Sequence, residues 1–129
     1  MTTFGDAFFA ASVLARPLRT QVDVPFCLQH EARYSFYWQY AQDCLKDSFR
    51  RGEYPLLPAM VFFQPGLLND SNGEEISLGI KTSRQWGQVA QQLAVYTDLG
   101  IDATMQCLIE QAKQDGIGVD FRHLPVGRY

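Results

Sequence analysis

The sequence predicts a small three-layer α/β/α sandwich whose central sheet is mainly parallel. Short apolar runs of strand length alternate along the chain with longer segments in which apolar residues recur at helical spacing. Such alternation is typical of parallel strands joined by right-handed helical crossovers, with helices on both faces of the sheet. The length of 129 residues suits one domain, 1–129, that can bury a real core.

Composition narrows the classes of function. Hydrophobic residues make up 47% and charged residues 19%, a common profile for soluble globular proteins. A net charge of -3 and scattered basic residues argue against nucleic-acid binding by counterion release. No apolar stretch approaches the roughly 20 residues that a membrane helix needs, so no membrane partner is expected. The three cysteines show no metal-ligand spacing, which predicts reduced thiols in a cytoplasmic protein and no metal.

The amino-terminal third of the chain predicts a strand, an irregular connection and a helix. Residues 7–14, AFFAASVL, form an apolar run typical of a fully buried strand. Residues 15–30 are interpreted as an irregular connection, with room for a short strand near 22–24. From 31 to 51 apolar residues recur at helical spacing, and Gly52 is a natural stop.

A second strand and a loop follow. The stretch YPLLPAMVFF, 54–63, predicts a strand with proline at its margins. The next stretch, QPGLLNDSNGEE, is dense in turn-forming residues and predicts a loop.

The rest of the chain continues the alternation. A helix is expected over 74–91, a buried strand over 92–97, and a third helix from Asp102 until Gly116. IGVDFRHL, 117–124, predicts a last short strand. The fold expected is therefore Rossmann-like, and such sheets bind ligands beyond the carboxyl ends of the strands, near the switch in strand order. This rule places three parts of the chain near one potential pocket: Ser12, the stretch 60–64 that ends at Gln64, and the stretch 96–105.

Asp102 stands at the predicted start of the third helix and allows two interpretations. As an N-cap it would accept a hydrogen bond from the N–H of Thr104 or Met105. A helix N-terminus also attracts anions, although a second negative charge would discourage a phosphate there. The carboxylate would still accept hydrogen bonds from ribose hydroxyls.

Few other groups suggest catalysis. Asp98 and Asp102 lie four residues apart, and two nearby acids can split their pKa values and do acid–base work, although a solvated turn is the commoner arrangement. His30 and His123 show no spacing for a triad or a metal. No phosphate-binding glycine loop and no nucleophile elbow occurs in the sequence, so no cofactor is expected.

The stretch YSFYWQY, 34–40, is unusually aromatic. Helical spacing would place Tyr34, Tyr37 and Trp38 on one stripe, with Phe36 and Tyr40 further round. Three interpretations stay open: core packing, a subunit interface, or a wall that stacks on a ligand.

Three stretches carry a resemblance to a known family. They are RRGEYPLLPAMVFFQPGLLND, SLGI, and LAVYTDLGIDATMQCLIEQAKQDGIGV, within residues 41–124, roughly two thirds of the chain. In order and spacing the chain resembles the nucleoside 2-deoxyribosyltransferase-like superfamily, in particular its uncharacterised phage and bacterial branch. The resemblance implies a pocket for a nucleoside or nucleotide, a glutamate that attacks the anomeric carbon, and a homo-oligomer that completes its pockets across subunits.

The reactive positions of that family differ here. Its glutamate nucleophile corresponds to Leu108, an acid before the central strand to Gln91, and a histidine after the second proline to Ala59. A carboxylate stabilises the oxocarbenium character that develops when an N-glycosidic bond breaks, and leucine cannot. The chain is therefore expected to be a pseudoenzyme.

Three functional hypotheses follow. The first is non-catalytic binding of a nucleoside, nucleotide or ADP-ribose-like molecule, which could sequester a nucleotide signal. The second is cleavage of an N-glycosidic bond by Asp98 or Asp102, and the third is a structural or interaction protein that uses the aromatic helix 34–40. For the first, sugar hydroxyls and the ring face would be contacted by eight candidates: Ser12, Gln64, Tyr96, Asp98, Asp102, Thr104, Met105 and Leu108.

Overall fold

A four-stranded, all-parallel sheet forms the centre of the computed structural model, which describes residues 18–25, 31–125 and 129. The strand order is β2-β1-β3-β4, and every neighbouring pair is parallel. The strands are β1 (Arg19–Asp23), β2 (Tyr54–Leu56), β3 (Gln92–Tyr96) and β4 (Gly118–Arg122). From β1 the chain moves to one side to form β2 and later to the other side to form β3. The switch point therefore lies between β1 and β3.

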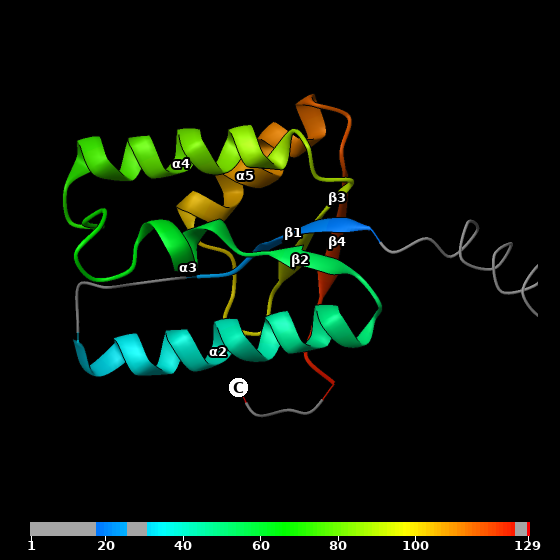
Figure 1. The fold of residues 1–129 in the computed structure, drawn as a ribbon, viewed down its shortest axis with the longest axis horizontal. Coiled ribbons are helices and arrows are strands. Elements are labelled where there is room, and N and C mark those ends of the chain that lie inside the picture. Colours follow the sequence, from blue (N-terminus) through cyan, green and yellow to red (C-terminus); the bar gives the residue numbers. More distant parts are fainter. Residues whose placement is uncertain (1–17, 26–30, 126–128) are drawn as a thin grey trace, which may run out of the picture.

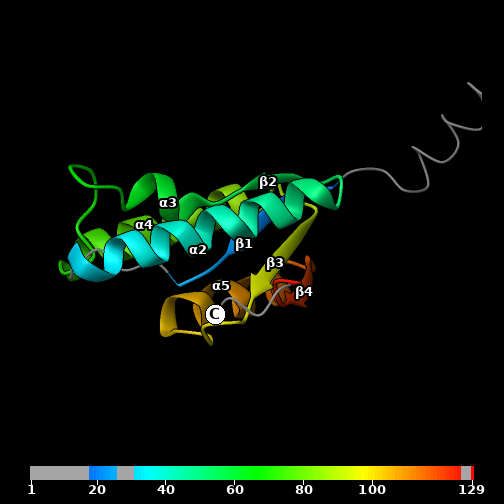
Figure 2. The same cartoon turned by 90° about the horizontal axis from the view of Figure 1, so that it is seen from below.

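Helices cover both faces of this sheet (Figure 1). They are α2 (Glu31–Arg50), α3 (Pro58–Phe62), α4 (Gly73–Gly87) and α5 (Ala103–Gln114). Helix α2 lies along one face, and α4 and α5 lie side by side on the other, with α3 leading from β2 into α4 (Figures 1 and 2). The three-layer Rossmann-like prediction is confirmed.

The core has two parts because successive residues of a strand point to opposite faces. Ala94 and Tyr96 of β3 pack in the cluster under α2, while Leu93 and Val95 pack against α5. All four side chains are buried. The near-continuous apolar character of β3 thus reflects burial on both faces.

The predicted helices agree closely with the observed ones. The helix expected over 31–51 is α2, and the one expected over 74–91 is α4, which ends earlier, at Gly87. Asn72 fixes the start of α4 because its side-chain oxygen accepts hydrogen bonds from the N–H groups of Glu74 and Glu75, at 3.0 and 3.3 Å. The predicted strands at 92–97 and 117–124 are β3 and β4.

Two predictions about the first half need correction. The strand predicted over 54–63 is wrong beyond residue 56, because residues 58–62 form α3. Pro58 opens this helix, where a missing N–H costs little, and a short apolar run does not distinguish strand from helix. The stretch 15–30 is not only a connection, since 19–23 form a central strand. The strand predicted at 7–14, with Ser12, lies outside the described residues.

Within the described part of the chain, no helix is both long enough and apolar enough to span a membrane.

Candidate ligand-binding site

Asp23 is the last residue of β1 and lies at the switch point of the sheet. It pairs in register with Val95, whose side chain packs against α5, so Asp23 points to the same face. Its exposed fraction is 4%, and its Oδ2 atom is buried with no hydrogen-bond partner among the described residues. Buried polar atoms almost always have a partner. The carboxyl ends of the strands beside the switch point are where such folds hold ligands, so the unpartnered oxygen of Asp23 is a candidate for ligand contact.

Asp102 stands near Asp23, at the start of α5. Its Oδ1 accepts a hydrogen bond from the N–H of Met105 at 2.8 Å, so the predicted N-cap is confirmed. Burial, and after it the charge of Asp102, raises the pKa of Asp23 well above its usual value. The elevated pKa favours a protonated Asp23, which can donate as well as accept a hydrogen bond. The exposed carboxyl group of Asp102 adds an acceptor.

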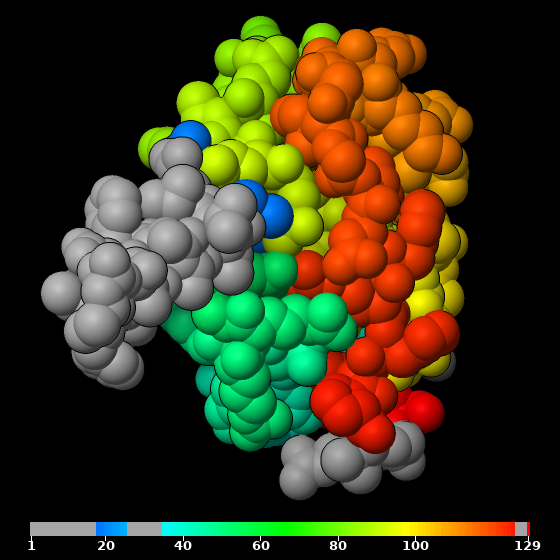
Figure 3. All heavy atoms as spheres, turned by 90° about the vertical axis from the view of Figure 1, so that its right-hand side faces the viewer, coloured from blue at the N-terminus to red at the C-terminus, as the bar shows by residue number. Residues whose placement is uncertain are grey.

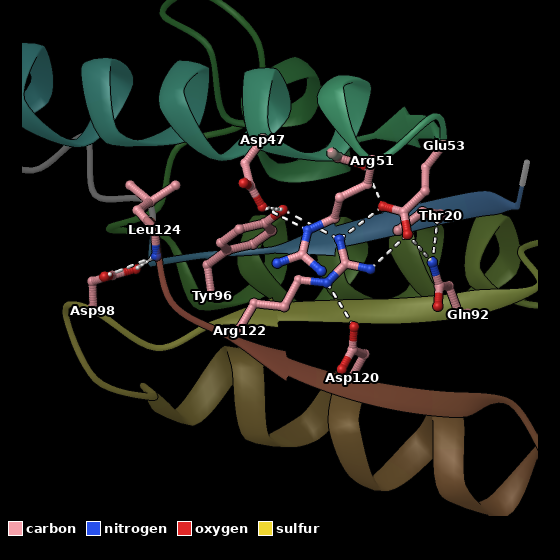
Figure 4. Close-up of polar contacts among 11 residues, drawn as sticks. Thr20, Asp47, Arg51, Glu53, Gln92, Tyr96, Asp98, Asp120, Arg122 and Leu124 are labelled. Atoms are coloured by element: carbon pink, nitrogen blue, oxygen red, sulfur yellow. Dashed lines mark hydrogen bonds and ion pairs between the residues drawn. The ribbon is translucent and has the colours of Figure 1, made fainter. Parts of the chain in front are cut away.

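Asp98 is hydrogen-bonded within the protein. It accepts a hydrogen bond from the Tyr40 hydroxyl at 2.8 Å. It also accepts from the backbone N–H of Leu124, at 3.1 and 3.2 Å to its two oxygens (Figure 4). Burial first, with Cys44 and Asp98 nearby, raises the pKa of Tyr40, so the phenol stays protonated and donates. Asp98 thereby joins the end of β3 to α2 and to the segment after β4.

Tyr96 ends β3 but faces the opposite side of the sheet from Asp23. Its hydroxyl donates to Asp47 of α2 at 2.8 Å and accepts from Arg122 at 3.2 Å. The structure therefore does not bring Tyr96 together with Asp23 and Asp102.

The remaining candidates occupy varied environments. Met105 is buried in the core beneath α5, while Thr104, next to it, is partly exposed. Leu108 packs against the α5 cluster and lines a small cavity of about 10 Å³ between α4 and α5. Gln64 is exposed after α3 and donates to the carbonyl of Val61 at 2.8 Å.

A buried ion pair lies on the α2 face of the sheet (Figure 4). Arg122 donates from its two terminal nitrogens to the two carboxylate oxygens of Glu53, at 2.7 and 2.6 Å. Its Nε donates to Asp120 at 2.7 Å. The hydroxyl of Ser48 and the amide of Gln92 also donate to Glu53, at 2.8 and 2.6 Å. This pair is well satisfied within the protein, which marks it as a structural tie rather than a ligand site.

Sequence reasoning missed both Asp23 and Arg122. The available signal for Asp23 was one acid between two valines, in QVDVP. For Arg122 it was a single arginine inside the last strand. Within the described residues, no group of three or more histidine, cysteine or acidic side chains could hold a metal ion.

The aromatic helix stretch is partly covered by the chain itself. Tyr40 is fully buried, and the ring of Tyr129 packs edge-on against it with centroids 4.7 Å apart. Phe36 is 47% exposed and contacts Tyr37 and Tyr129 edge-on. Core packing therefore accounts for Tyr40, whereas Phe36 faces solvent in part.

Comparison with known proteins places the chain in a family. Residues 24–122 match the family described as a domain of unknown function (DUF7768), a range that contains Asp102 and begins directly after Asp23. No curated protein and no solved structure matches the chain. Because the match covers most of its length, the chain belongs to the DUF7768 family.

Proposed function

We propose that this chain binds a nucleoside- or nucleotide-type small molecule, ADP-ribose-like compounds included, without reacting with it. The proposed site is the region beyond the carboxyl ends of β1 and β3. The observation that carries the proposal is the Oδ2 atom of Asp23, which is buried and has no partner among the described residues. Leaving such a group unpaired costs stability, so a bound ligand that pairs with it restores the lost interaction.

The chemistry of the two acids favours a sugar over a phosphate at this point. The carboxyl oxygens of Asp23 and Asp102 can accept hydrogen bonds from hydroxyl groups. A protonated Asp23 can also donate one hydrogen bond. Ribose hydroxyls both donate and accept hydrogen bonds, whereas a phosphate would meet the negative charge of Asp102. The partly exposed hydroxyl of Thr104 lies in the first turn of α5 and could extend the same contacts.

The residue at the resembled nucleophile position argues against turnover. Leu108 packs with its neighbours on the apolar face of α5. It supplies neither charge nor a covalent bond to an anomeric carbon. Binding without cleavage would suit a protein that sequesters a nucleotide signal.

Mass spectrometry of the purified protein tests this proposal. The chain is denatured, and the released small molecules are compared between the wild type, Asp23→Asn, and the control Glu110→Gln, which makes the matching change at an exposed acid on helix α5. An intact nucleoside-type compound is expected from the wild type and the control, and less of it from Asp23→Asn. Equal recovery from all three proteins would contradict a role for Asp23.

A second candidate function is cleavage of an N-glycosidic bond with Asp102 as a catalytic carboxylate. The observation that favours it is the pairing of a buried acid of raised pKa with an exposed acid, an arrangement that can divide proton donation and charge stabilisation between two groups. Asp98 is less suited because its carboxylate is engaged by Tyr40 and Leu124. Release of free base from a nucleoside, abolished by Asp102→Asn, would support this candidate over simple binding.

A further inference from the structure

One face of the edge strand β2 carries exposed apolar side chains. Tyr54 and Leu56 of β2 are 64% and 41% exposed, and Trp86 and Val89 at the end of α4 are 52% and 58% exposed. These four side chains line a cavity of about 170 Å³, and we call them the β2 patch. Strands of parallel sheets are normally covered on both faces. Four large apolar groups around one hollow form a contiguous patch, which marks a surface of contact.

We propose that residues 7–14 of the same chain, AFFAASVL, dock onto the β2 patch, with Phe8 and Phe9 filling the cavity. This inference is independent of the function proposed above.

Connectivity favours this occupant. Arg19, the first residue of β1, lines the same cavity, and its side chain donates from Nε to the carbonyl of Val89 at 3.2 Å. Figure 3 looks at the end where the strands begin and shows the start of β1, in blue, beside the yellow-green segment that joins α4 to β3. Only residues 15–18 separate the apolar run from Arg19, a reach of about 13 Å when extended. A segment tethered this closely has an effective concentration on the order of millimolar, so even a weak contact is occupied.

The free edge of β2 favours contact through side chains over addition of a strand. The N–H of Tyr54 donates to the carbonyl of Leu18 at 2.9 Å, toward β1. Pro55, the next residue, therefore faces the free edge, where it has no N–H to offer. The run at 7–14 contains Phe8, Phe9, Val13 and Leu14, which suits an apolar hollow.

The fluorescence of Trp86 reports on this contact. The full chain carrying Trp38→Phe leaves Trp86 as its one tryptophan, since the sequence has two. Acrylamide quenching is measured in this background and in the same background with Phe8→Ser and Phe9→Ser. The matched control is Phe121→Ser, which makes the same change at an exposed phenylalanine on β4, at the opposite edge of the sheet. Far-ultraviolet circular dichroism checks that each variant is folded.

We expect the Phe8/Phe9 variant to raise the quenching constant of Trp86 at least twofold and the Phe121 variant to leave it unchanged. An unchanged constant in the Phe8/Phe9 variant overturns the proposal. If the constant is unchanged in that variant but the quenching of Trp86 increases when the protein is diluted, a second copy of the chain covers the patch instead.

Discussion

Arg122 and Glu53 join the two edge strands of the sheet through a bidentate ion pair. Arg122 ends β4, and Glu53 immediately precedes β2, yet their side chains meet beneath α2 at 2.7 and 2.6 Å. Both side chains are largely buried, at 3% and 11% exposure. The pair spans β1 and β3 and therefore holds the full width of the sheet against one helix.

Removing one member of this pair should destabilise the protein strongly. Arg122→Met leaves the Glu53 carboxylate buried without its main partner, and such changes cost about 3–5 kcal/mol of unfolding free energy. Urea unfolding measures the loss. The comparison is Arg51→Met, which breaks the ion pair between the partly exposed Arg51 and the buried Asp47. Asp47 keeps its hydrogen bond from Tyr96, so the loss should be smaller than for Arg122→Met. Similar losses for the two variants would show that the Arg122–Glu53 pair contributes no more stability than the Arg51–Asp47 pair.

The Arg122–Glu53 ion pair also predicts how the stability of the protein depends on pH. Burial alone would raise the pKa of Glu53, but hydrogen bonds from Arg122, Ser48 and Gln92 outweigh burial and hold this pKa below 4.5. A lowered pKa in the folded state gives stability that is present above the unfolded pKa and lost as the pH falls through the folded pKa. Unfolding free energy should thus fall on acidification below about pH 4.5 more steeply for the wild type than for Glu53→Gln. If the unfolding free energies of the wild type and Glu53→Gln change in parallel with pH, the lowered pKa of Glu53 is contradicted.

Gly79 marks a close contact between α4 and the segment after α3. A Cβ atom placed there would collide with the ring of Phe63, so Gly79→Ala forces a shift in the core. We expect a loss of about 1–3 kcal/mol in unfolding free energy, although alanine favours helices by about 1 kcal/mol over glycine. Gly73→Ala, in the same helix with open space around it, should be neutral or slightly stabilising. Equal midpoints for both variants in thermal unfolding would refute the close packing.

Asp23 should reduce the stability of the ligand-free protein. Its pKa is raised in the folded state, so its favourable contribution is present below the unfolded pKa, about 3.9, and is lost as the pH rises toward the folded pKa. Asp23→Asn should therefore match the wild type near pH 4 and exceed it at pH 8, by about 1 kcal/mol or more. Chemical unfolding at the two pH values measures this difference. A variant that is less stable at pH 8 would show that Asp23 has an unseen partner.

Much of the fold could be predicted because periodicity and caps act locally. The helical spacing of α2 and the positions of Asn72 and Asp102 define helix boundaries without reference to the rest of the chain. The segment 54–63 could not be predicted in the same way, since β2 and α3 share one apolar run and only tertiary packing separates them. β1 was obscured for a related reason, because its residues RTQVD include polar groups that are buried by partners far away in sequence.

The candidate site was only partly predictable. Asp102 carries a local signal, an acid before a helix, and its capping role is observed. Asp23 carries little local signal, because its significance depends on which strands flank the switch point. Tyr96 was assigned to the pocket from its position in the chain, but the alternation of a strand sends it to the α2 face. The nucleoside-type ligand and the homo-oligomer stay predictions.

The most direct test of the binding proposal is thermal unfolding of the wild type, Asp23→Asn and Glu110→Gln in the presence of a panel of nucleosides, nucleotides and ADP-ribose. A ligand that binds the folded chain stabilises it by RT ln(1 + [L]/Kd). We predict that at least one compound raises the midpoint of the wild type and of Glu110→Gln by several degrees and leaves that of Asp23→Asn nearly unchanged. No shift with any compound, or an equal shift in Asp23→Asn, would contradict binding at the end of β1.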